Sequence, residues 1–389
     1  MKSLSCLFIS VFLLMVGCNS LSVRDIQDIG AVVEEPSKAK QVLKDKGRRY
    51  AESQIPADIR TLKATVETFL KQINVIWGKD DAKQPGPKDY VKYTEKYYNR
   101  AHVDFEAGTI TIETLAPDSQ EAYLKKAIVT TLLTPNDPRQ VDLYSDALPK
   151  GEGEGKPFLY EQVLDHEGKA IAWEWRANRY ADYLIKNKIS RVTIGKKNGL
   201  RVVFPLVKTH HKIRAYKYAS LVQKYSKKYN VTESLIYGII KTESSFNPFA
   251  VSHAPAYGLM QVVPSTAGKD VFQKIKQQQG QPTAQNLYNP EYNIDIGTAY
   301  IKILQERYLV KVKDQNAKRY TVISAYNGGA GNVLKTFSSN RDKAVVKINQ
   351  LSSTQVYEQL TNKHPKLESR RYLYKVNEAQ KEFWKDNGF

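Results

Sequence analysis

One carboxyl group, that of Glu243, stands where the sequence pattern places an acid against an apolar surface. Leu235, Ile236, Ile239 and Ile240 precede it at the spacing of one buried helix face. Glu243 follows Ile240 by three residues and Ile239 by four, so it projects from the same face as these side chains. The end of a helix carries partial negative charge, and apolar neighbours remove water. Both effects disfavour the ionised carboxylate, so we expect a raised pKa for Glu243.

A glutamic acid that stays protonated near neutral pH can donate its proton to a glycosidic oxygen as the bond breaks. The helix that carries it is predicted over 233–244. Thr232 or Asn230 can cap its start, and Pro248 prevents it from continuing. The alternative is a helix-end glutamate that turns to solvent or pairs with Lys241. The residues around Glu243 decide between the two interpretations.

Several short motifs follow Glu243 in one order. They are Glu243–Pro248, Ser252, Gly258–Gln261, Asn293–Asp295 and Ala325–Gly329, with Glu368–Tyr372 further on. Each motif alone is weak, but the ordered set resembles the catalytic domain of the soluble-lytic-transglycosylase family, which has a goose-type lysozyme fold. Upstream, Gly86–Thr94 and Gly108–Thr114 resemble the membrane-bound lytic murein transglycosylase C family. The resemblance covers most of residues 70–389.

This resemblance implies a non-hydrolytic cleavage of peptidoglycan. Family members use one glutamic acid, which protonates the oxygen between N-acetylmuramic acid and N-acetylglucosamine. The ionised carboxylate then takes the proton of the muramyl C6 hydroxyl, which closes a 1,6-anhydro ring. The downstream acids considered as partners of Glu243 are Glu291 and Asp295, and we interpret Asp295 as a helix-end or packing residue. No metal-ligand spacing is present, and no metal or organic cofactor is expected.

Six more positions match family residues that lie near the substrate. Met260 could instead fill the core, and Tyr326 could be a packed aromatic. By resemblance, Tyr357 closes the cleft from the C-terminal side together with Leu360 and Arg370. The expected roles are Ser252 near the substrate, Met260 and Gln261 lining the sugar sites, the Tyr326 hydroxyl approaching the acid, Asn327 on an acetamido group, and Tyr357 at the cleft edge.

The N-terminus has the layout of a lipoprotein signal peptide. Lys2 is followed by an apolar run over Leu4–Val16, which is too short to anchor stably across a bilayer. The run ends in Leu-Met-Val-Gly-Cys, which resembles a lipobox, although Met15 replaces the usual leucine. Cleavage before Cys18 leaves it as the only cysteine, so we expect a lipid there. By the family's sorting rule, Asn19 favours the outer membrane, facing the periplasm. The alternative is an ordinary secreted protein cleaved elsewhere.

The composition is strongly basic, with 59 Lys and Arg against 40 Asp and Glu and a net charge of +19. Such a surface attracts polyanions, so nucleic acid must be considered. No helix-turn-helix, zinc-ligand spacing or RNA-binding aromatic motif is present, and the basic residues are scattered. We therefore expect peptidoglycan glycan strands, not nucleic acid, as the partner. Two other functions stay open: a lysozyme-type hydrolase, and a wall-binding lipoprotein without activity.

The elements predict an α+β protein: a small α+β N-terminal domain, then a mostly α, lysozyme-like catalytic domain. A hairpin is predicted around 103–112, a helix over 121–133, and β-like runs over 171–175 and 201–207. Asp165-His166-Glu167 is interpreted as a polar turn. Further helices are expected over 216–229, 293–308, 320–326, 332–337 and 369–384, and a solvated loop over 269–285. The expected divisions are 1–17 signal peptide, 18–60 tether, 61–208 N-terminal domain and 209–389 catalytic domain.

Overall fold

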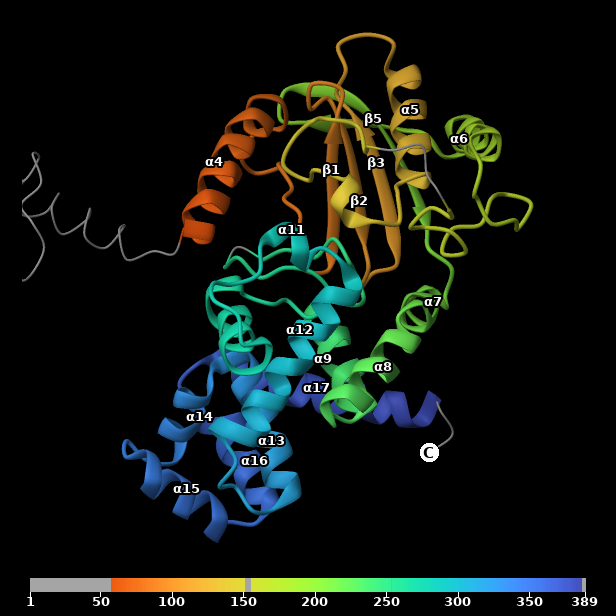
Figure 1. Cartoon of the computed structure of the whole chain (residues 1–389). Helices are drawn as coiled ribbons and strands as arrows, with labels where there is room; N and C mark the ends of the chain where they lie inside the picture. Colours follow the sequence, from red (N-terminus) through yellow and green to blue (C-terminus); the bar gives the residue numbers. More distant parts are fainter. Residues whose placement is uncertain (1–56, 151–154, 253, 387–389) are drawn as a thin grey trace, which may run out of the picture. The chain divides into compact units, whose positions relative to one another are not determined.

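The computed structural model describes residues 57–150, 155–252 and 254–386. The signal peptide, Cys18 and nearly all of the predicted tether therefore lie outside the described residues. Residues 61–389 form one compact unit. It combines an antiparallel sheet with a larger set of helices, as the α+β prediction requires (Figure 1).

The sheet has five antiparallel strands in the order β1-β2-β3-β5-β4. Their inward side chains alternate with outward ones, so cross-strand pairs such as Val103 with Ile110 and Ile112 with Val202 are buried together. The predicted hairpin is confirmed as β2 and β3. The strands are β1 Asp89–Thr94, β2 Asn99–Asp104, β3 Thr109–Thr114, β4 Ser190–Ile194 and β5 Lys197–Pro205.

Both faces of the sheet are covered. Helix α5 (Gln120–Leu132) lies over β2, β3 and β5 and also packs against α6 (Glu174–Lys188) (Figure 1). On the other face, Phe69, Ile73 and Trp77 of α4 (Ala57–Trp77) form a separate small core with Val91 and Tyr93 of β1. The sheet is thus a layer covered on both faces, and only its edges and loops are left to contact the rest of the unit.

The β-like run predicted over 171–175 is wrong. Helix α6 begins at Glu174, and Trp173 and Trp175 are largely exposed, at 66% and 56%. The alternating aromatics indicated a strand because Trp favours strands. The buried positions Ala177, Tyr180, Ala181 and Leu184 follow helical spacing instead and bury the helix against the sheet side. The Asp165 turn is confirmed, since its carboxylate accepts from the backbone N–H groups of Glu167 and Lys169.

The remaining chain is helical. The helix predicted over 293–308 begins three residues earlier, at Pro290, and its last turn widens into a π-helical segment. The helix predicted over 216–229 is divided at Tyr218. The elements are α7 His210–Lys217, α8 Ala219–Tyr229, α9 Glu233–Ser244, η3 Pro264–Gly268, α10 Lys269–Val271, η4 Phe272–Lys276, α11 Ala284–Leu287, α12 Pro290–Ile303, η5 Leu304–Tyr308, α13 Gln315–Gly328, α14 Ala330–Phe337, α15 Arg341–Gln350, α16 Ser353–Lys363 and α17 Leu367–Asp386.

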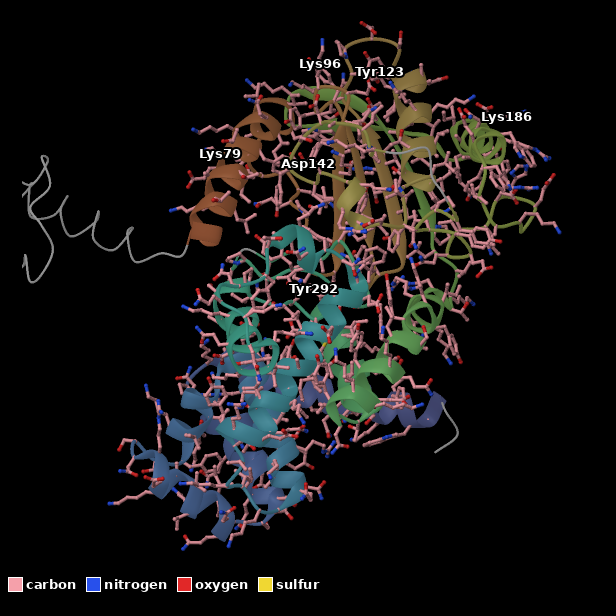
Figure 2. The ribbon with its side chains drawn as sticks, in the orientation of Figure 1. Lys79, Lys96, Tyr123, Asp142, Lys186 and Tyr292 are labelled. Atoms are coloured by element: carbon pink, nitrogen blue, oxygen red, sulfur yellow. The ribbon has the colours of Figure 1, made fainter. Side chains whose placement is uncertain are left out.

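The solvated loop predicted over 269–285 is wrong for its first half. Residues 264–276 are helical, because Val271 is fully buried and anchors the segment in the core. The run of Gln and Lys was read as solvent-exposed, but these side chains occupy only the outer face. Helices α15 and α16 were not predicted, since short, polar, amphipathic helices give weak periodicity. Figure 2 shows basic side chains such as Lys79, Lys96 and Lys186 spread over the surface.

Sheet and helices share one continuous core. Phe249, in the loop after α9, contacts Tyr90 of β1 and Phe158, with ring centroids 5.0 Å apart in both pairs. Nearby, Asn247 Nδ2 donates to the carbonyl oxygen of Pro87 at 3.2 Å. The loop that ends the predicted catalytic helix is therefore fixed directly onto the first strand of the sheet.

Arg214 of α7 makes a second connection at the same place. Its side chain is fully buried; Nε donates to the Ser245 carbonyl at 3.0 Å and Nη1 to Gln162 Oε1 at 2.8 Å. The guanidinium also lies 4.5 Å from the ring of Phe105. Burial lowers the pKa of Arg214 to about 10, so it remains charged at neutral pH. A buried cation thus holds the residue two places beyond Glu243.

Candidate active site

The helix that carries Glu243 begins and ends where the sequence predicts. In α9, Ile236, Ile239 and Ile240 are fully buried, and Thr232 occupies the N-cap position, although its side chain makes no capping bond. The helix ends at Ser244; the next residue, Ser245, has a left-handed φ of 50°, and its N–H donates to the Lys241 carbonyl. Glu243 is thereby presented at the very end of a buried helix, half-buried itself.

Helix α17 supplies the facing wall. It packs closely along α9, because Gly238 has no side chain: a Cβ there would lie 3.0 Å from Gln380 Cγ and 3.1 Å from the Val376 carbonyl. This approach brings Glu368 and Tyr372, one helical turn apart, beside Glu243. The Glu368–Tyr372 motif is thus joined to Glu243 by the fold.

Glu243 opens onto a cleft of about 610 Å³. One wall comes from the sheet, where Lys88 forms an ion pair with Glu106, and Asp89 Oδ1 accepts a hydrogen bond from His102 Nε2 at 2.8 Å. The cleft is lined by Pro87, Lys88, Asp89 and Glu106 from the sheet side, Thr242 and Glu243 from α9, and Leu367, Glu368, Arg371, Tyr372 and Lys375 from α17. The N-terminal part of the chain therefore forms part of the candidate active site, which motif reasoning did not show.

Loss of water around Glu243 raises the pKa of its carboxyl group to about 8. The negative charge of Glu368 raises this pKa further, whereas Tyr372 and the Lys88 ammonium lower it. The Tyr372 hydroxyl lies close enough to favour the ionised carboxylate, although the two do not form a hydrogen bond of regular geometry. The expected pKa rise has the expected cause, desolvation. At neutral pH Glu243 is mostly protonated and can act as an acid.

Tyr326 and Asn327 lie close to this centre. Tyr326 Oη donates to the Met260 carbonyl at 2.8 Å, and the Tyr326 pKa is raised first by burial and second by the negative charge of Glu243 when that group is ionised. Asn327 Nδ2 donates to Glu368 Oε1 at 3.2 Å, while Ser369 Oγ donates to Asn327 Oδ1 at 2.6 Å. The structure therefore links Asn327 to the cleft through Glu368.

None of the six residues expected near the substrate is part of the cleft lining, and four of them have other contacts. Met260 is fully buried, its sulfur beside Thr298 at 3.9 Å, which favours the core-filler alternative. Gln261 Nε2 donates to the Gly258 carbonyl at 3.0 Å, and Ser252 Oγ donates to the Ala254 carbonyl. Tyr357 packs edge-on against Tyr320 with centroids 5.1 Å apart. Substrate contacts for these four remain predictions.

The sequence did not indicate that Glu368 lines the cleft with Glu243, together with Asp89 and Glu106. The two downstream acids expected as possible partners of Glu243, Glu291 and Asp295, do not line the cleft. Asp295 is instead held by Tyr229 Oη at 2.6 Å and Lys228 at 2.9 Å, which fits its interpretation as a packing residue. The available signal was Glu368 in the Glu-Ser-Arg-Arg-Tyr motif. Among the described residues, no three His, Cys, Asp or Glu side chains are grouped as metal ligands.

Two substitutions should shift the alkaline limb of the pH–activity profile, where activity falls as Glu243 loses its proton, in opposite directions. Glu368→Gln removes a negative charge that raises the Glu243 pKa, so the limb should shift to lower pH. Lys88→Met removes a positive charge that lowers this pKa, so the limb should shift to higher pH. The check is the pH dependence of the turnover of purified peptidoglycan. Shifts of the same sign in both variants would contradict this electrostatic account of the cleft.

Proteins of known name are similar to this chain over most of its length. A protein of Photorhabdus laumondii named membrane-bound lytic murein transglycosylase C is 51% identical over 341 residues, which cover 87% of this chain and 94% of the relative. The chain belongs to the membrane-bound lytic murein transglycosylase C family. A Yersinia pestis protein of the same name is 52% identical over 315 residues, covering 81% of this chain and 87% of that one.

Sequence profiles divide the family match into two parts. Residues 55–217 match the profile described as the N-terminal domain of membrane-bound lytic murein transglycosylase C, and residues 220–349 match the transglycosylase SLT domain. The crystal structure of the 70 kDa soluble lytic transglycosylase of Escherichia coli is 25% identical over 44% of this chain and 24% of that one, with a TM-score of 0.35.

Proposed function

We propose that this protein cleaves the β-1,4 bond between N-acetylmuramic acid and N-acetylglucosamine in peptidoglycan and forms 1,6-anhydromuramic acid ends. Glu243 carries the proposal, because desolvation raises its pKa to about 8 in a cleft large enough for sugar residues. The names of the family's members describe the same class of activity. The protein would thus act in turnover and remodelling of the cell wall.

The proposed mechanism uses Glu243 twice. Its carboxyl proton passes to the glycosidic oxygen, which leaves as the hydroxyl of N-acetylglucosamine, and positive charge develops at the muramyl C1. The carboxylate formed then removes the proton of the muramyl C6 hydroxyl, and the C6 oxygen bonds to C1. One proton leaves Glu243 and one returns, so no water is consumed. Lys88 and Tyr372, which favour the ionised carboxylate, would stabilise Glu243 between the two steps.

A second candidate is hydrolysis. It is favoured by one observation: Glu368 lines the same cleft as Glu243 and its charge raises the Glu243 pKa, so a further carboxyl group lies near the acid, as attack by a water molecule would require. The two candidates give different products from the same bond. An inert wall-binding protein would give neither product.

Mass spectrometry of digested peptidoglycan should therefore decide the reaction. We expect muropeptides ending in 1,6-anhydromuramic acid, each lighter by one water than the hydrolytic product. The Glu368→Gln variant should release the same anhydro ends, because the C6 hydroxyl replaces water as the nucleophile. A spectrum dominated by reducing muramic acid ends would exclude the transglycosylase mechanism and favour the hydrolytic one.

The proposal includes a lipid anchor at Cys18, supported by the apolar run over 4–16 and the Gly17-Cys18 pair that ends it. Related proteins are named membrane-bound, and no described helix is long and apolar enough to cross a membrane. By the family's sorting rule, Asn19 favours the outer membrane, facing the periplasm, as the location of the anchored protein. The described part, which begins at residue 57, would then act on the adjacent wall.

Cys18→Ala should abolish lipidation. The variant should carry no labelled fatty acid and should either be soluble in the periplasm or accumulate with its signal peptide uncleaved. Metabolic labelling with palmitate, followed by membrane fractionation, measures both outcomes. Cys6→Ala is the matched control and should leave labelling unchanged, because Cys6 lies within the predicted signal peptide. Labelled Cys18→Ala protein in the outer membrane would show that the lipobox assignment is wrong.

A further inference from the structure

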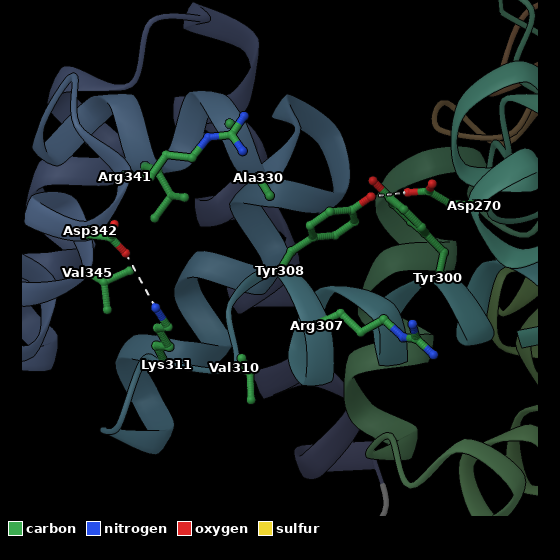
Figure 3. A pocket seen from close by; sticks show the side chains of 12 residues that line it. Asp270, Tyr300, Arg307, Tyr308, Val310, Lys311, Ala330, Arg341, Asp342 and Val345 are labelled. Atoms are coloured by element: carbon green, nitrogen blue, oxygen red, sulfur yellow. Dashed lines mark hydrogen bonds and ion pairs between the residues drawn. The ribbon is translucent and has the colours of Figure 1, made fainter. Parts of the chain in front are cut away.

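A second hollow, of about 500 Å³, lies in the helical part of the protein and shares no lining residue with the Glu243 cleft. Figure 3 shows Arg341 and Asp342 of α15 on one side and Tyr308, Tyr300 and Asp270 on the other. Nothing in the proposed mechanism uses this hollow. Its lining residues are Asp270, Tyr300, Arg307, Tyr308, Val310, Lys311, Ala330, Gly331, Leu334, Arg341, Asp342 and Val345.

The two carboxylates of the hollow already have partners. Asp270 accepts a hydrogen bond from Tyr308 Oη at 2.7 Å and pairs with Lys274 at 2.5 Å. Asp342 pairs with Lys311 at 3.4 Å (Figure 3). These contacts neutralise the two negative side chains, and neither of them involves the other cations of the lining, Arg307 and Arg341.

Two guanidinium groups in the hollow lack a carboxylate. Arg307 donates to the Lys274 carbonyl at 3.1 Å, and within the described part of the chain it has no ion pair. Arg341, the first residue of α15, has neither an ion pair nor a hydrogen bond to any described residue. A smaller hollow of about 200 Å³ shares Arg341 and adds Lys335, which extends the positive surface. The site therefore suits an anion.

The rest of the lining is apolar or aromatic. Val310, Leu334 and Val345 offer aliphatic surface, and Tyr300 and Tyr308 offer rings. A small inorganic anion would leave this surface uncovered, whereas a neutral sugar would leave both guanidinium groups unpaired. A peptide that carries carboxylates along an aliphatic backbone matches both features, since guanidinium groups pair well with carboxylates.

The hollow adjoins the candidate active site through one pair of rings. Tyr300, in its lining, lies 5.7 Å from the ring of Tyr326, and Tyr326 is close enough to Glu243 for the two groups to interact electrostatically. Ala330, also in the lining, follows Asn327 by three residues, and Asn327 is bonded to Glu368. A strand held at Glu243 could therefore extend a substituent toward the hollow.

We propose that this hollow binds the carboxylates of the peptide stem carried by a muramoyl residue of the strand being cleaved. The inference rests on the proposed function, because it assumes that a glycan strand occupies the cleft. Arg307 and Arg341 pair with stem carboxylates, while Val310, Leu334 and Val345 contact the aliphatic parts of the stem. The site selects strands that still carry stems.

The test compares three soluble substrates in turnover assays on the full-length protein. They are intact strands, strands stripped of stems by an amidase, and intact strands whose carboxylates are converted to methylamides. The test variants are Arg341→Gln and the double variant Arg307→Gln with Arg341→Gln. Lys343→Gln with Lys347→Gln is the matched control, because both lysines lie on exposed positions of α15 outside the hollow and the charge change is equal.

For intact strands the double variant should raise KM about tenfold, the effect expected for two partly exposed ion pairs. Its turnover of stripped and methylamidated strands should match that of the wild type, and the lysine control should match on all three. An equal rise in KM on stripped strands would mean that the hollow binds sugars. An unchanged KM on intact strands would mean that Arg307 and Arg341 do not bind the substrate. Either result overturns the proposal. Wild-type protein that forms no anhydro ends from intact strands would instead contradict the proposed function.

If the double variant unfolds, Arg341→Gln alone decides the question. Arg341 has no partner among the described residues, so this substitution removes no contact that stabilises the fold. We expect a smaller rise in KM, about threefold, restricted to intact strands, with an unchanged thermal midpoint of unfolding.

Discussion

Glu243→Gln should reduce the rate of peptidoglycan cleavage at least about a hundredfold, the lower end of what general acid–base catalysis contributes. Gln has the same shape but cannot donate a proton in the first step or accept one in the second. The measurement is release of soluble muropeptides from purified sacculi. Glu233→Gln, at the opposite end of α9, is the matched control and should keep wild-type activity. Near-normal lysis by Glu243→Gln would mean that Glu243 is only a helix-end residue.

The wild-type rate should also depend on pH in a defined direction. Cleavage requires Glu243 to be protonated at the start, so the rate should fall as pH rises through about 8. The same shift has a stability consequence. The folded-state pKa of Glu243 lies above the ordinary value for glutamate. The contribution of protonated Glu243 to the free energy of unfolding is therefore fully present below that ordinary value and is lost as the pH rises through about 8.

Glu243→Gln should therefore be more stable than wild type at pH 8 and equally stable near pH 4, where the acid is protonated in both states. Thermal unfolding at both pH values measures the difference. A variant less stable than wild type at pH 8 would mean that the ionised carboxylate, and not the acid, is the form that the cleft favours.

Arg214→Ala should lower the free energy of unfolding by about 3–5 kcal/mol, the range for deleting a large, buried, hydrogen-bonded side chain. The substitution leaves a cavity and removes the bonds to the Ser245 carbonyl and Gln162. Denaturation by urea measures the loss. Arg191→Ala, which truncates an exposed arginine on β4, is the control and should change stability by about 0.5 kcal/mol or less.

Activity separates a positioning role for Arg214 from a purely structural one. Because Arg214 holds Ser245, two residues beyond Glu243, its loss should lower kcat more than it raises KM, even where the variant is fully folded. Arg214→Lys should not restore kcat, since an ammonium cannot reproduce the planar set of donors. Full kcat in folded Arg214→Ala would restrict this residue to a structural role.

The sequence was most informative where local patterns coincide with burial. Helix α9 was predicted to the residue because Ile236, Ile239 and Ile240 are all in the core, and the same spacing placed Glu243 correctly on that face. The error over 171–175 arose where aromatic residues are exposed at a helix start. Local propensity there pointed to a strand, whereas the buried residues that determine α6 come later in the chain.

The sequence predicted the chemistry of the candidate site, an acid with a raised pKa, but not the residues that form the walls of the cleft. Glu368 and Tyr372 reach Glu243 because Gly238 lets α17 approach α9, a contact between positions more than a hundred residues apart. Lys88 and Glu106 reach it because Phe249 and Asn247 fix the end of α9 to β1. Such long-range contacts leave no periodic signal in one sequence.

The contacts of Phe249 with Tyr90 and Phe158 bear on how this protein unfolds. Its two family segments match separate profiles, yet buried apolar residues from both segments belong to one continuous cluster in the described part of the chain. Separating them would expose three aromatic rings and break the buried bonds of Arg214. The segments should therefore melt together as one cooperative unit. A catalytic segment fused to an unrelated protein would therefore lose the side of the Glu243 cleft that the N-terminal segment forms, and it would also lose stability.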